Sequence, residues 1–379
     1  MATPPLWYAV LKAAALPPHS YTSFVAAIFF TGFPGFLGSE LLPRVVARTD
    51  AYALCLVQPK FRALAEERAA QIIAKRPELA NRIRLVEGDL TAPLDHVPAD
   101  EISEIYHLAA AYDLSVPRDV GMRVNVTGTT RVLDLAARVS RLERLHYIST
   151  CYVSGRHPGL FTEDDLEKGQ TFNNYYEETK QLAEVEVRKR MNQIPATIYR
   201  PSVVVGDSTT GATQKFDGPY FVIQWLMRQP KLAVLPVVGR PAQYRFNVVP
   251  RDFVMNAIEY LSSLKTNAGR TYALADPEPL TVDETIDTIA EATKRTVLRV
   301  PLTLGMAKGA LDHVPGVYRL MRIPSAAVNY FVHPTTYDTT RATRDLAVAG
   351  IVAPRFPDYA PRLVEFVREH PEIGSAAMV

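Results

Sequence analysis

Short apolar runs alternate with longer amphipathic segments from residue 25 to about residue 200. The apolar runs hold four to six residues and are rich in β-branched and aromatic side chains, as is typical of buried strands. They predict strands at Val25–Phe30, Tyr52–Val57, Ile83–Val86, Glu104–Leu108, Leu145–Ser149 and Ala196–Tyr199. Helical periodicity fills the intervals between them, at 36–49, 60–75, 120–140 and 174–192.

Strands that alternate with helices of ten or more residues predict an α/β fold, with a doubly wound parallel sheet covered by helices on both faces. After Arg200 the alternation loosens, and Pro and Gly become frequent. A helix-like stretch followed by Thr271–Leu274 is expected to return to the sheet. We therefore predict a sheet domain of residues 25–202 and 247–275, and a smaller mixed lobe of residues 203–246 and 276–379, which would bind the substrate.

The composition is that of an ordinary soluble globular protein, with 47% hydrophobic and 22% charged residues in 379. The formal net charge of +2 excludes a strong basic field, so we expect no nucleic-acid partner. Two cysteines, Cys55 and Cys151, cannot build a disulfide framework, and each lies in an apolar run that predicts a buried strand. This cysteine content predicts a reducing, cytoplasmic location.

The first 24 residues hold one charged side chain, Lys12, and four prolines. They lack the basic start of a signal peptide, and no run reaches the roughly 18 apolar residues that a membrane span requires. We predict an irregular N-terminal extension over residues 1–24 that makes no membrane contact.

A glycine-rich turn, TGFPGFLG, follows the first strand and opens the first helix. Gly32 permits a tight turn, Gly35 allows a pyrophosphate to approach the backbone, and Gly38 lets the helix lie close to the strand. The phosphate charge would then lie at the helix N-terminus. The turn predicts a Rossmann dinucleotide site made by Gly32, Gly35, Phe36, Leu37 and Gly38. Pro43 is expected to kink the helix that follows.

The end of the second strand bears on the choice between the two nicotinamide dinucleotides. Gln58 stands where an NAD-preferring site usually has an acid that binds the ribose 2′-hydroxyl. Lys60 and Arg62 follow, and both are close enough in sequence to bind a 2′-phosphate. We therefore favour NADP(H) over NAD(H); the alternative is that Lys60 and Arg62 form the solvated start of a helix.

Two further strand ends are expected to face the cofactor. Asp89 and Leu90 follow the third strand, where the carboxylate could bond the adenine amine. Ala109 and Ala110 follow the fourth, where small side chains leave room for the cofactor.

The fifth strand and the next helix carry candidate chemistry. Thr150 directly follows the strand, and Tyr176-x-x-x-Lys180 places a phenol and an ammonium on one helix face. A nearby cation stabilises a phenolate, which brings a tyrosine closer to acid–base work at neutral pH. The Thr150 hydroxyl would hold the substrate oxygen. Ser149 and Tyr175 are the competing hydroxyl and phenol, but strand alternation points Ser149 to the other side, and Tyr175 lacks a cation four residues on.

These motifs occur in the order of the extended short-chain dehydrogenase/reductase superfamily, which the chain resembles over most of residues 25–275. They are TGxxGxxG, GDL, HLAA, NVTGT, ST followed by YVSG, YxxxK and RPSVVVG. Within that superfamily the chain is most similar to the male-sterility branch, which includes fatty acyl-CoA reductases and thioester-reductase domains. The segments CLVQPK, HYISTCYVSG, the turn at 206–211 and NVVPRDFV carry that likeness.

The resemblance implies roles for individual residues. Thr150, Tyr176 and Lys180 would be the catalytic set, and Lys180 would also bond the nicotinamide ribose. Pro201 and Ser202 would lie beside the nicotinamide. The implied reaction is hydride transfer from NADPH to a small molecule, a fatty or polyketide-like acyl thioester or its aldehyde. Thioester reductases usually carry Arg at the position of Gln58. Homodimers formed by two helices per subunit are common in this superfamily.

Several alternatives stay open. A nucleotide-sugar epimerase or a hydroxysteroid-type dehydrogenase would use the same Thr, Tyr and Lys, and a non-catalytic NADP-binding sensor would not need the Tyr-x-x-x-Lys motif. Dehydration is disfavoured, because Cys151 stands where a dehydratase has an acid. The eight histidines lack metal-ligand spacing, so we predict no metal.

Two other patterns have competing explanations. The apolar stretches Tyr220–Met227 and Leu302–Val332 would form either a channel for an acyl chain or the small lobe's own core. Asn125-Val126-Thr127 fits a glycosylation sequon, which has no meaning in a cytoplasmic helix.

Overall fold

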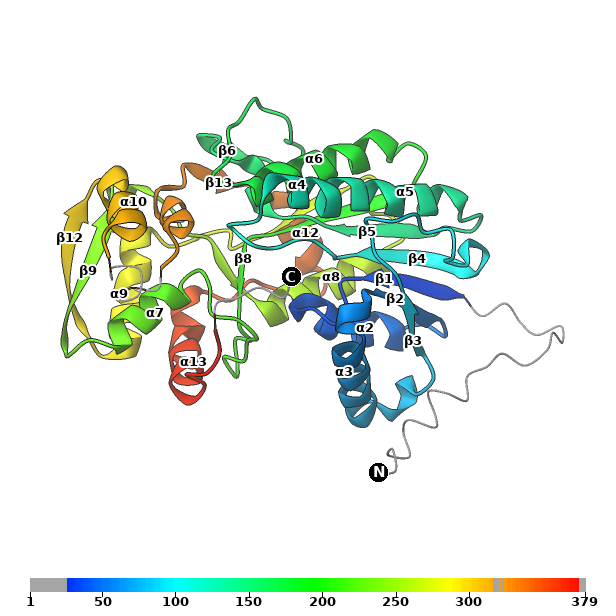
Figure 1. The fold of residues 1–379 in the computed structure, drawn as a ribbon, viewed down its shortest axis with the longest axis horizontal. Helices are drawn as coiled ribbons and strands as arrows, with labels where there is room; N and C mark the ends of the chain where they lie inside the picture. The colour runs from blue at the N-terminus through cyan, green and yellow to red at the C-terminus, as the bar shows by residue number, and fades with distance from the viewer. Residues whose placement is uncertain (1–25, 316–320, 322, 375–379) are drawn as a thin grey trace.

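The computed structural model describes residues 26–315, 321 and 323–374, so the predicted extension at 1–24 lies outside the described residues (Figure 1). A seven-stranded parallel sheet forms its centre, in the order β11-β7-β5-β4-β1-β2-β3. Its strands are β1 (Ala27–Thr31), β2 (Tyr52–Val57), β3 (Ile83–Glu87), β4 (Ile102–His107), β5 (Arg144–Ile148), β7 (Ala196–Pro201) and β11 (Thr271–Leu274). The doubly wound Rossmann fold is therefore confirmed, and so is the return to the sheet, because Tyr272 of β11 pairs with Tyr199 of β7.

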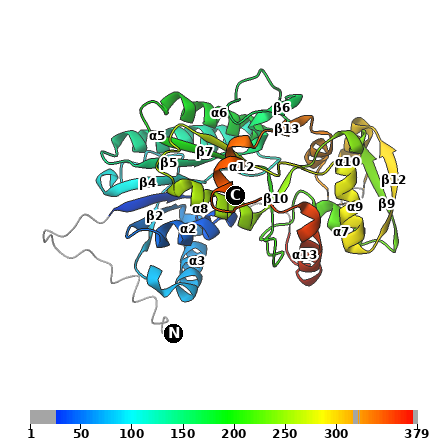
Figure 2. The same ribbon diagram turned by 180° about the vertical axis from the view of Figure 1, so that it is seen from behind.

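Helices cover both faces of the sheet, as Figures 1 and 2 show. The apolar faces of β1 and β2 pack against one helical layer and the opposite faces against the other. One layer consists of α2 (Phe36–Ala47), α3 (Arg62–Lys75), α8 (Arg251–Ser263) and α12 (Thr340–Ala347); the other contains α5 (Gly128–Arg138) and α6 (Tyr175–Arg190). Pro43 does not end α2, which runs on to Ala47.

The predicted helix at 120–140 is interrupted. It consists of α4 (Arg118–Gly121), a π-helical stretch at Met122–Thr127, and α5. Asn125 lies in the π-helical stretch, accepts a hydrogen bond from the Ala111 backbone N–H at 2.7 Å, and donates to the Thr179 hydroxyl at 2.9 Å. The wider turn thus brings a buried amide to two neighbouring segments, a tertiary effect that helical periodicity does not reveal. Buried in this way, Asn125 offers no surface for glycosylation.

The remaining elements form a smaller mixed lobe beside the sheet (Figure 1). Its core joins the apolar faces of helices and of a two-stranded parallel sheet, and includes Phe216, Ile223, Leu235, Ile289 and Leu363. The elements are α7 (Tyr220–Met227), β9 (Leu232–Val238), α9 (Val282–Thr293), β12 (Thr296–Leu302), α10 (Leu304–His313) and α13 (Phe356–Glu369). Two short parallel pairs complete the chain: β8 (Val203–Val205) with β10 (Val248–Pro250), and β6 (Gly159–Phe161) with β13 (Thr335–Tyr337).

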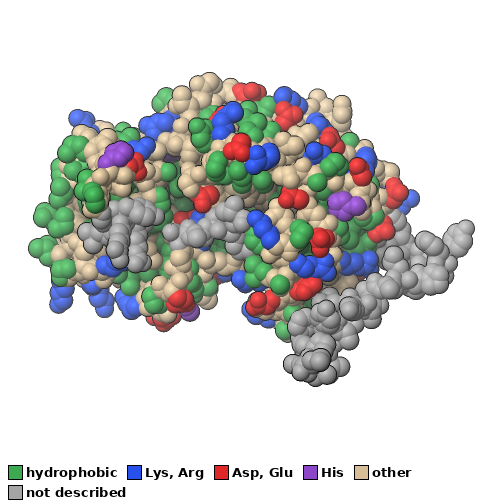
Figure 3. All heavy atoms as spheres, in the orientation of Figure 1, with side chains coloured by type: hydrophobic (Ala, Val, Ile, Leu, Met, Phe, Trp, Pro, Cys, Tyr) green, Lys and Arg blue, Asp and Glu red, His purple; other side chains and the backbone are tan. Residues whose placement is uncertain are grey.

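Many side chains of the two apolar stretches pack inside this lobe, although Met306 and Val314 are exposed. Tyr220, Ile223 and Leu226 of α7 are buried in its core, and Phe221 packs with Val328 and other residues from 304–332. These side chains therefore form the lobe's own core. Figure 3 shows hydrophobic side chains on the outer edge of the lobe as well, where Leu232, Val234 and Leu298 of β9 and β12 are exposed.

Two details differ from the expectations. Cys55 lies in β2 as predicted, but Cys151 does not lie in a strand: β5 ends at Ile148, and Cys151 begins a 3₁₀ turn that extends to Ser154. Both thiols are free and buried.

Helix α12 falls within 276–379, which was predicted to belong to the small lobe, yet its Ala342 and Leu346 pack against the sheet domain. Among the described residues, no helix is both long enough and apolar enough to cross a bilayer.

Buried histidines make the fold sensitive to acid. Burial lowers the pKa of His333 from 6.5 to about 3, so the folded protein keeps this ring neutral while the unfolded chain protonates it below about pH 6.5. The unfolded state then binds more protons, and stability falls as the pH falls. The contribution of His333 to this loss is about 2 kcal/mol at pH 5.

We expect His333→Gln to reduce the loss of unfolding free energy between pH 7.5 and pH 5 by about that amount. Urea unfolding at the two pH values measures it. An equal loss in the variant and the wild type would contradict the neutral, buried state of this ring.

Candidate active site

The glycine-rich turn packs so closely that larger residues do not fit. Gly32 has a φ of +93°, and its carbonyl accepts a hydrogen bond from the Gly35 N–H at 2.9 Å. A Cβ atom on Gly32 would lie 2.8 Å from the Cβ atom of Leu108, and one on Gly38 would lie 2.3 Å from the Gly32 carbonyl oxygen. The turn therefore holds the start of α2 against β1 and β4.

The N-terminus of α2 suits an anion. Gly35 is its N-cap and supplies no side-chain cap, and the first turn, which includes Phe36 and Leu37, contains no acidic residue. The first backbone N–H groups of a helix have no partner within the helix, and they attract negative charge. These features fit the pyrophosphate of a dinucleotide.

The residues predicted to face the adenosine end meet at the ends of β2 and β3. Gln58 donates from Nε2 to Oδ2 of Asp89 at 2.8 Å. Arg62 is engaged in an ion pair with Glu66 at 2.8 Å, whereas the Lys60 ammonium lies 4.9 Å from the centre of the Phe61 ring. Of the two predicted cations, Arg62 is therefore the one already bound to a carboxylate.

The small residues after β4 lie beside the glycine turn. The Ala109 N–H donates to the Thr31 hydroxyl at 3.2 Å, and Ala110 follows it. Leu90 is buried against Gly128 at the start of α5.

Thr150 and Tyr176 come together at the carboxyl end of β5. The Thr150 hydroxyl donates to the Pro201 carbonyl at 3.3 Å and accepts from the Tyr152 N–H at 3.2 Å. Burial raises the pKa of the Tyr176 phenol above its usual value, and a hydrogen bond with the Thr150 side chain opposes that rise. The phenol is therefore protonated at neutral pH and lies next to the hydroxyl that was predicted to hold the substrate oxygen.

Lys180 lies one helical turn beyond Tyr176. Its buried ammonium donates to the Ile148 carbonyl at 2.8 Å and stands 4.5 Å from the centre of the Tyr147 ring. Burial lowers the pKa of Lys180 to about 7, although the Glu184 carboxylate favours the charged form. In this structure the ammonium bonds to β5 rather than to the phenol.

The competing side chains lie elsewhere. Ser149 donates its hydroxyl to Glu184 at 2.6 Å, on the other side of the strand end from Thr150. Tyr175 is 49% exposed, whereas Tyr176 is 8% exposed. The geometry thus favours Thr150 and Tyr176 for the catalytic roles.

Ser202, which was predicted to lie beside the nicotinamide, has a buried side-chain hydroxyl that is available for a hydrogen bond. It follows Pro201 at the end of β7, and its backbone N–H donates to the Leu274 carbonyl at 3.1 Å. Its buried hydroxyl has no hydrogen-bond partner within the described part of the chain. Buried hydroxyls normally have partners, so this one fits a site that a bound group completes.

A group of residues that the sequence did not reveal covers Tyr176. The Tyr112 ring meets the Tyr176 ring edge-on, with centroids 5.1 Å apart. Its hydroxyl donates to Asp217 of the small lobe at 3.2 Å, and Asp217 pairs with Lys215 at 3.1 Å. This contact joins residues 105 apart in the chain, which no local pattern predicts.

Arg251 adds a cation next to the glycine turn. Its guanidinium lies 5.2 Å from the centre of the Phe36 ring, at the start of α2. The nearest carboxylates, those of Glu40 and Asp207, are 3.6 Å and 4.0 Å away. The motif NVVPRDFV contains this residue, but the motif alone did not indicate a place beside the cofactor turn.

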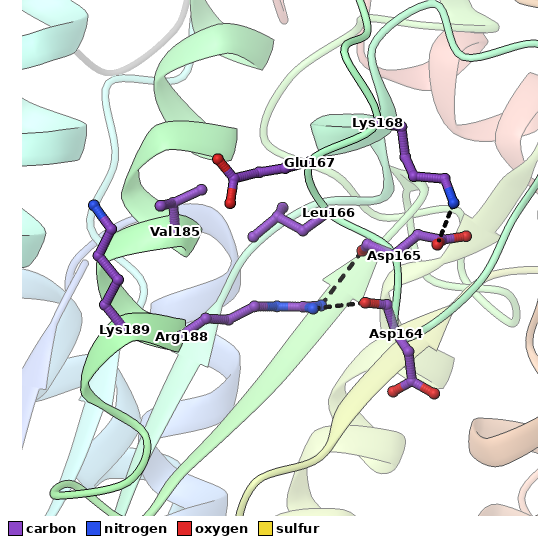
Figure 4. A pocket seen from close by; sticks show the side chains of 8 residues that line it. All are labelled: Asp164, Asp165, Leu166, Glu167, Lys168, Val185, Arg188 and Lys189. Atoms are coloured by element: carbon purple, nitrogen blue, oxygen red, sulfur yellow. Dashed lines mark hydrogen bonds and ion pairs between the residues drawn. The ribbon is translucent and has the colours of Figure 1, made fainter.

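A separate surface cavity of about 400 Å³ lies along the C-terminal half of α6 (Figure 4). Arg188 points from α6 to the carbonyl oxygen of Asp164 at 2.7 Å, and Lys168 pairs with Asp165 at 2.9 Å. The cavity is lined by none of the predicted site residues. Within the described residues, no cluster of three His, Cys, Asp or Glu side chains could hold a metal ion.

A family model described as "Male sterility protein" matches residues 30–258, more than half of the chain. The chain belongs to this family. A linear gramicidin synthase from Brevibacillus parabrevis is 29% identical over 71% of the chain and 5% of its own length. The aldehyde reductase lnbA from Aspergillus flavus is 26% identical over 72% of the chain and 29% of its own length. The chain thus spans only a small part of these relatives.

Solved structures of a terminal R domain and of an epimerase share the fold. The terminal R domain from the myxalamid biosynthetic pathway has a TM-score of 0.77 and 26% identity, over 96% of this chain and 95% of that one. UDP-glucuronic acid 4-epimerase from Bacillus cereus, in complex with NAD, has a TM-score of 0.65 and 18% identity, over 93% of this chain and 99% of that one. A likeness at this identity shows the fold alone. This male sterility family member is an NAD(P)-dependent oxidoreductase of the extended short-chain dehydrogenase/reductase type.

The close packing of the glycine turn gives a direct prediction. We expect Gly38→Ala to abolish measurable dinucleotide binding or to lower stability by at least about 2 kcal/mol, because the new methyl group would overlap a backbone carbonyl. Gly309→Ala in α10 is the matched control, since its Cβ meets nothing within 4 Å, and it should raise stability by about 0.5–1 kcal/mol. Fluorescence titration with NADPH measures binding, and thermal unfolding measures the stability of both variants. Normal binding and stability in Gly38→Ala would contradict the claim that a Cβ atom does not fit at this position.

Proposed function

We propose that the chain reduces a carbonyl with NADPH, preferably an acyl thioester or the aldehyde derived from it. The observation that carries this proposal is the pairing of a buried, protonated Tyr176 phenol with the Thr150 hydroxyl, one turn from the buried Lys180. When bound, the nicotinamide supplies the hydride. Gly32, Gly35, Phe36, Leu37, Gly38, Gln58, Lys60, Asp89, Leu90, Ala109, Ala110, Lys180, Pro201 and Ser202 would hold the cofactor.

The chain's own residues divide the remaining work. Thr150 and Tyr176 hold the carbonyl oxygen between their hydroxyl groups. Tyr176 donates its proton to that oxygen as negative charge develops on it. With a thioester, hydride and proton addition gives a hemithioacetal; its C–S bond then breaks, the hydroxyl proton goes to sulfur, and the aldehyde and a free thiol are released. The Lys180 ammonium stabilises the phenolate that remains, and it bonds the nicotinamide ribose.

The relatives support the substrate class. One is named an aldehyde reductase, and the terminal R domain of the myxalamid pathway covers nearly the whole chain. The small lobe would bind the substrate, with Tyr112 and Asp217 at the boundary between the lobe and Tyr176. The side chains of α7 pack in the lobe's core, so we do not assign them to an acyl channel.

Arg251 and Lys60 would supply the positive charge for the cofactor's phosphates. Arg251 stands beside the start of α2, where it can face the pyrophosphate. Lys60 would face the 2′-phosphate. Arg62 is less available to bind this phosphate, because its guanidinium is paired with Glu66.

Gln58→Asp tests the cofactor preference. A carboxylate at the end of β2 would repel a 2′-phosphate and bond a free ribose hydroxyl, so the ratio of kcat/KM for NADPH to that for NADH should fall at least about 10-fold. Initial-rate kinetics with both cofactors measure the ratio. An unchanged ratio would mean that Gln58 does not face the ribose.

Tyr176→Phe tests the proton donor. The variant should lose at least about 100-fold in kcat, because it retains the ring but not the proton, and should bind NADPH as tightly as the wild type. Tyr175→Phe is the matched control on the neighbouring, exposed position and should stay within about twofold of the wild-type kcat. NADPH oxidation is followed with octanoyl-CoA and octanal. Comparable losses in both variants would contradict the assignment.

A further inference from the structure

One face of α6 carries polar side chains at a spacing of four residues. Tyr176, Lys180 and Glu184 recur on this face and are all buried toward the sheet. Tyr176 and Lys180 belong to the proposed reaction centre, whereas Glu184 takes no part in the proposed reaction. Its carboxylate lies one turn beyond Lys180 and is fully buried.

Glu184 reaches the ends of two strands at once. One carboxylate oxygen accepts from the Ser149 hydroxyl at 2.6 Å, directly before Thr150. The other accepts from Nη2 of Arg200 at 2.6 Å, directly before Pro201. The Arg200 guanidinium in turn donates to the Asp165 carbonyl at 2.6 Å, which fixes it from the far side.

Burying the ion pair between Glu184 and Arg200 costs desolvation free energy, so it is an inefficient way to hold α6 on the sheet. The side chains of Arg200 and Glu184 are 2% and 0% exposed, and buried pairs rarely stabilise a fold more than apolar residues of similar size. Stability alone therefore gives little reason for charges at this point. What they do achieve is geometric, since bonds to fixed charges define the separation between α6 and both strand ends.

We propose that Glu184 is a positioning residue, which sets the Thr150 hydroxyl against Tyr176 and Lys180 through its bonds to Ser149 and Arg200. This inference rests on the proposed function. It adds a residue that touches neither the substrate nor the cofactor but fixes the distance between the hydroxyl and the phenol. A displacement of about 1 Å at a reaction centre can lower the rate about 100-fold.

The charge of Glu184 also acts on Lys180. The other groups around that ammonium are the Tyr147 ring and the Ile148 carbonyl of β5, His107 of β4, and Tyr176 on α6. Burial holds both tyrosine phenols protonated and lowers the pKa of His107 to about 3, so these groups are neutral near pH 7. Glu184 is the charge that raises the pKa of Lys180 against the effect of burial.

The experiment compares Ser149→Ala and Glu184→Gln with Glu163→Gln. Glu163 is a matched control, because it is also a buried carboxylate, but it bonds to the backbone N–H groups of Ala273, Arg341 and Ala342 instead. We measure kcat and KM with octanoyl-CoA and octanal, the Kd for NADPH, the pH profile and the melting temperature.

Ser149→Ala removes one bond to Glu184 and leaves the ion pair intact. We expect its kcat to fall about 10-fold, with the Kd for NADPH and the melting temperature close to wild type. Glu184→Gln should lose about 100-fold in kcat, and its alkaline limb should move to lower pH, because the Lys180 ammonium loses the carboxylate that favours it. Glu163→Gln should melt earlier but keep its kcat.

The inference is overturned if Ser149→Ala keeps its kcat within twofold of wild type, even if Glu184→Gln fails to fold. It is also overturned if both variants lose activity only in proportion to the folded fraction. If the wild type binds NADPH but reduces neither probe, the proposed function fails and this inference with it. If the wild type reduces a probe and the variants match it, only the inference fails.

Discussion

In the proposed function, the packing of one helix on the ends of two strands determines where the chemistry takes place. Helix α6 buries a phenol, an ammonium and a carboxylate against β5 and β7, and the carboxylate of Glu184 bonds to both strand ends. In our proposal, these bonds fix the helix at one distance from the sheet, so that Thr150 and Tyr176 meet. Burying any of these polar groups without a partner would be costly. Lys180 donates to the Ile148 carbonyl, and Glu184 accepts from Ser149 and Arg200.

The same burial shifts the pKa values of two of these side chains. It raises the pKa of the Tyr176 phenol and lowers that of Lys180 to about 7. A lysine that titrates near neutral pH can stabilise a phenolate at the working pH and release its charge at higher pH. In the proposed reaction, the charge of Lys180 would offset the effect of burial on the phenol.

The sequence predicted the sheet well, because the signals of its strands and of the glycine turn are local. Apolar runs mark strands wherever both faces are buried, and the glycine turn has a spacing that only close packing explains. Tyr112 contacts Asp217, and Arg251 lies beside Phe36. Both contacts join segments that are far apart in the chain, so a local sequence pattern could not predict them. Cys151 was wrongly placed in a strand, because an apolar run does not show where pairing ends and a 3₁₀ turn begins. The roles of the site residues, a homodimer and a cytoplasmic location stay predictions.

The most direct test of the central claim is to follow the hydride itself. NADPH with deuterium at both C4 positions of the nicotinamide is incubated with the chain and octanoyl-CoA, and the product is analysed by mass spectrometry. If the chain is a carbonyl reductase of the proposed kind, deuterium appears on the former carbonyl carbon, and Tyr176→Phe forms this product at least about 100-fold more slowly. Oxidation of NADPH without deuterium in the product, or the same labelled product from Tyr176→Phe at the wild-type rate, would contradict the account.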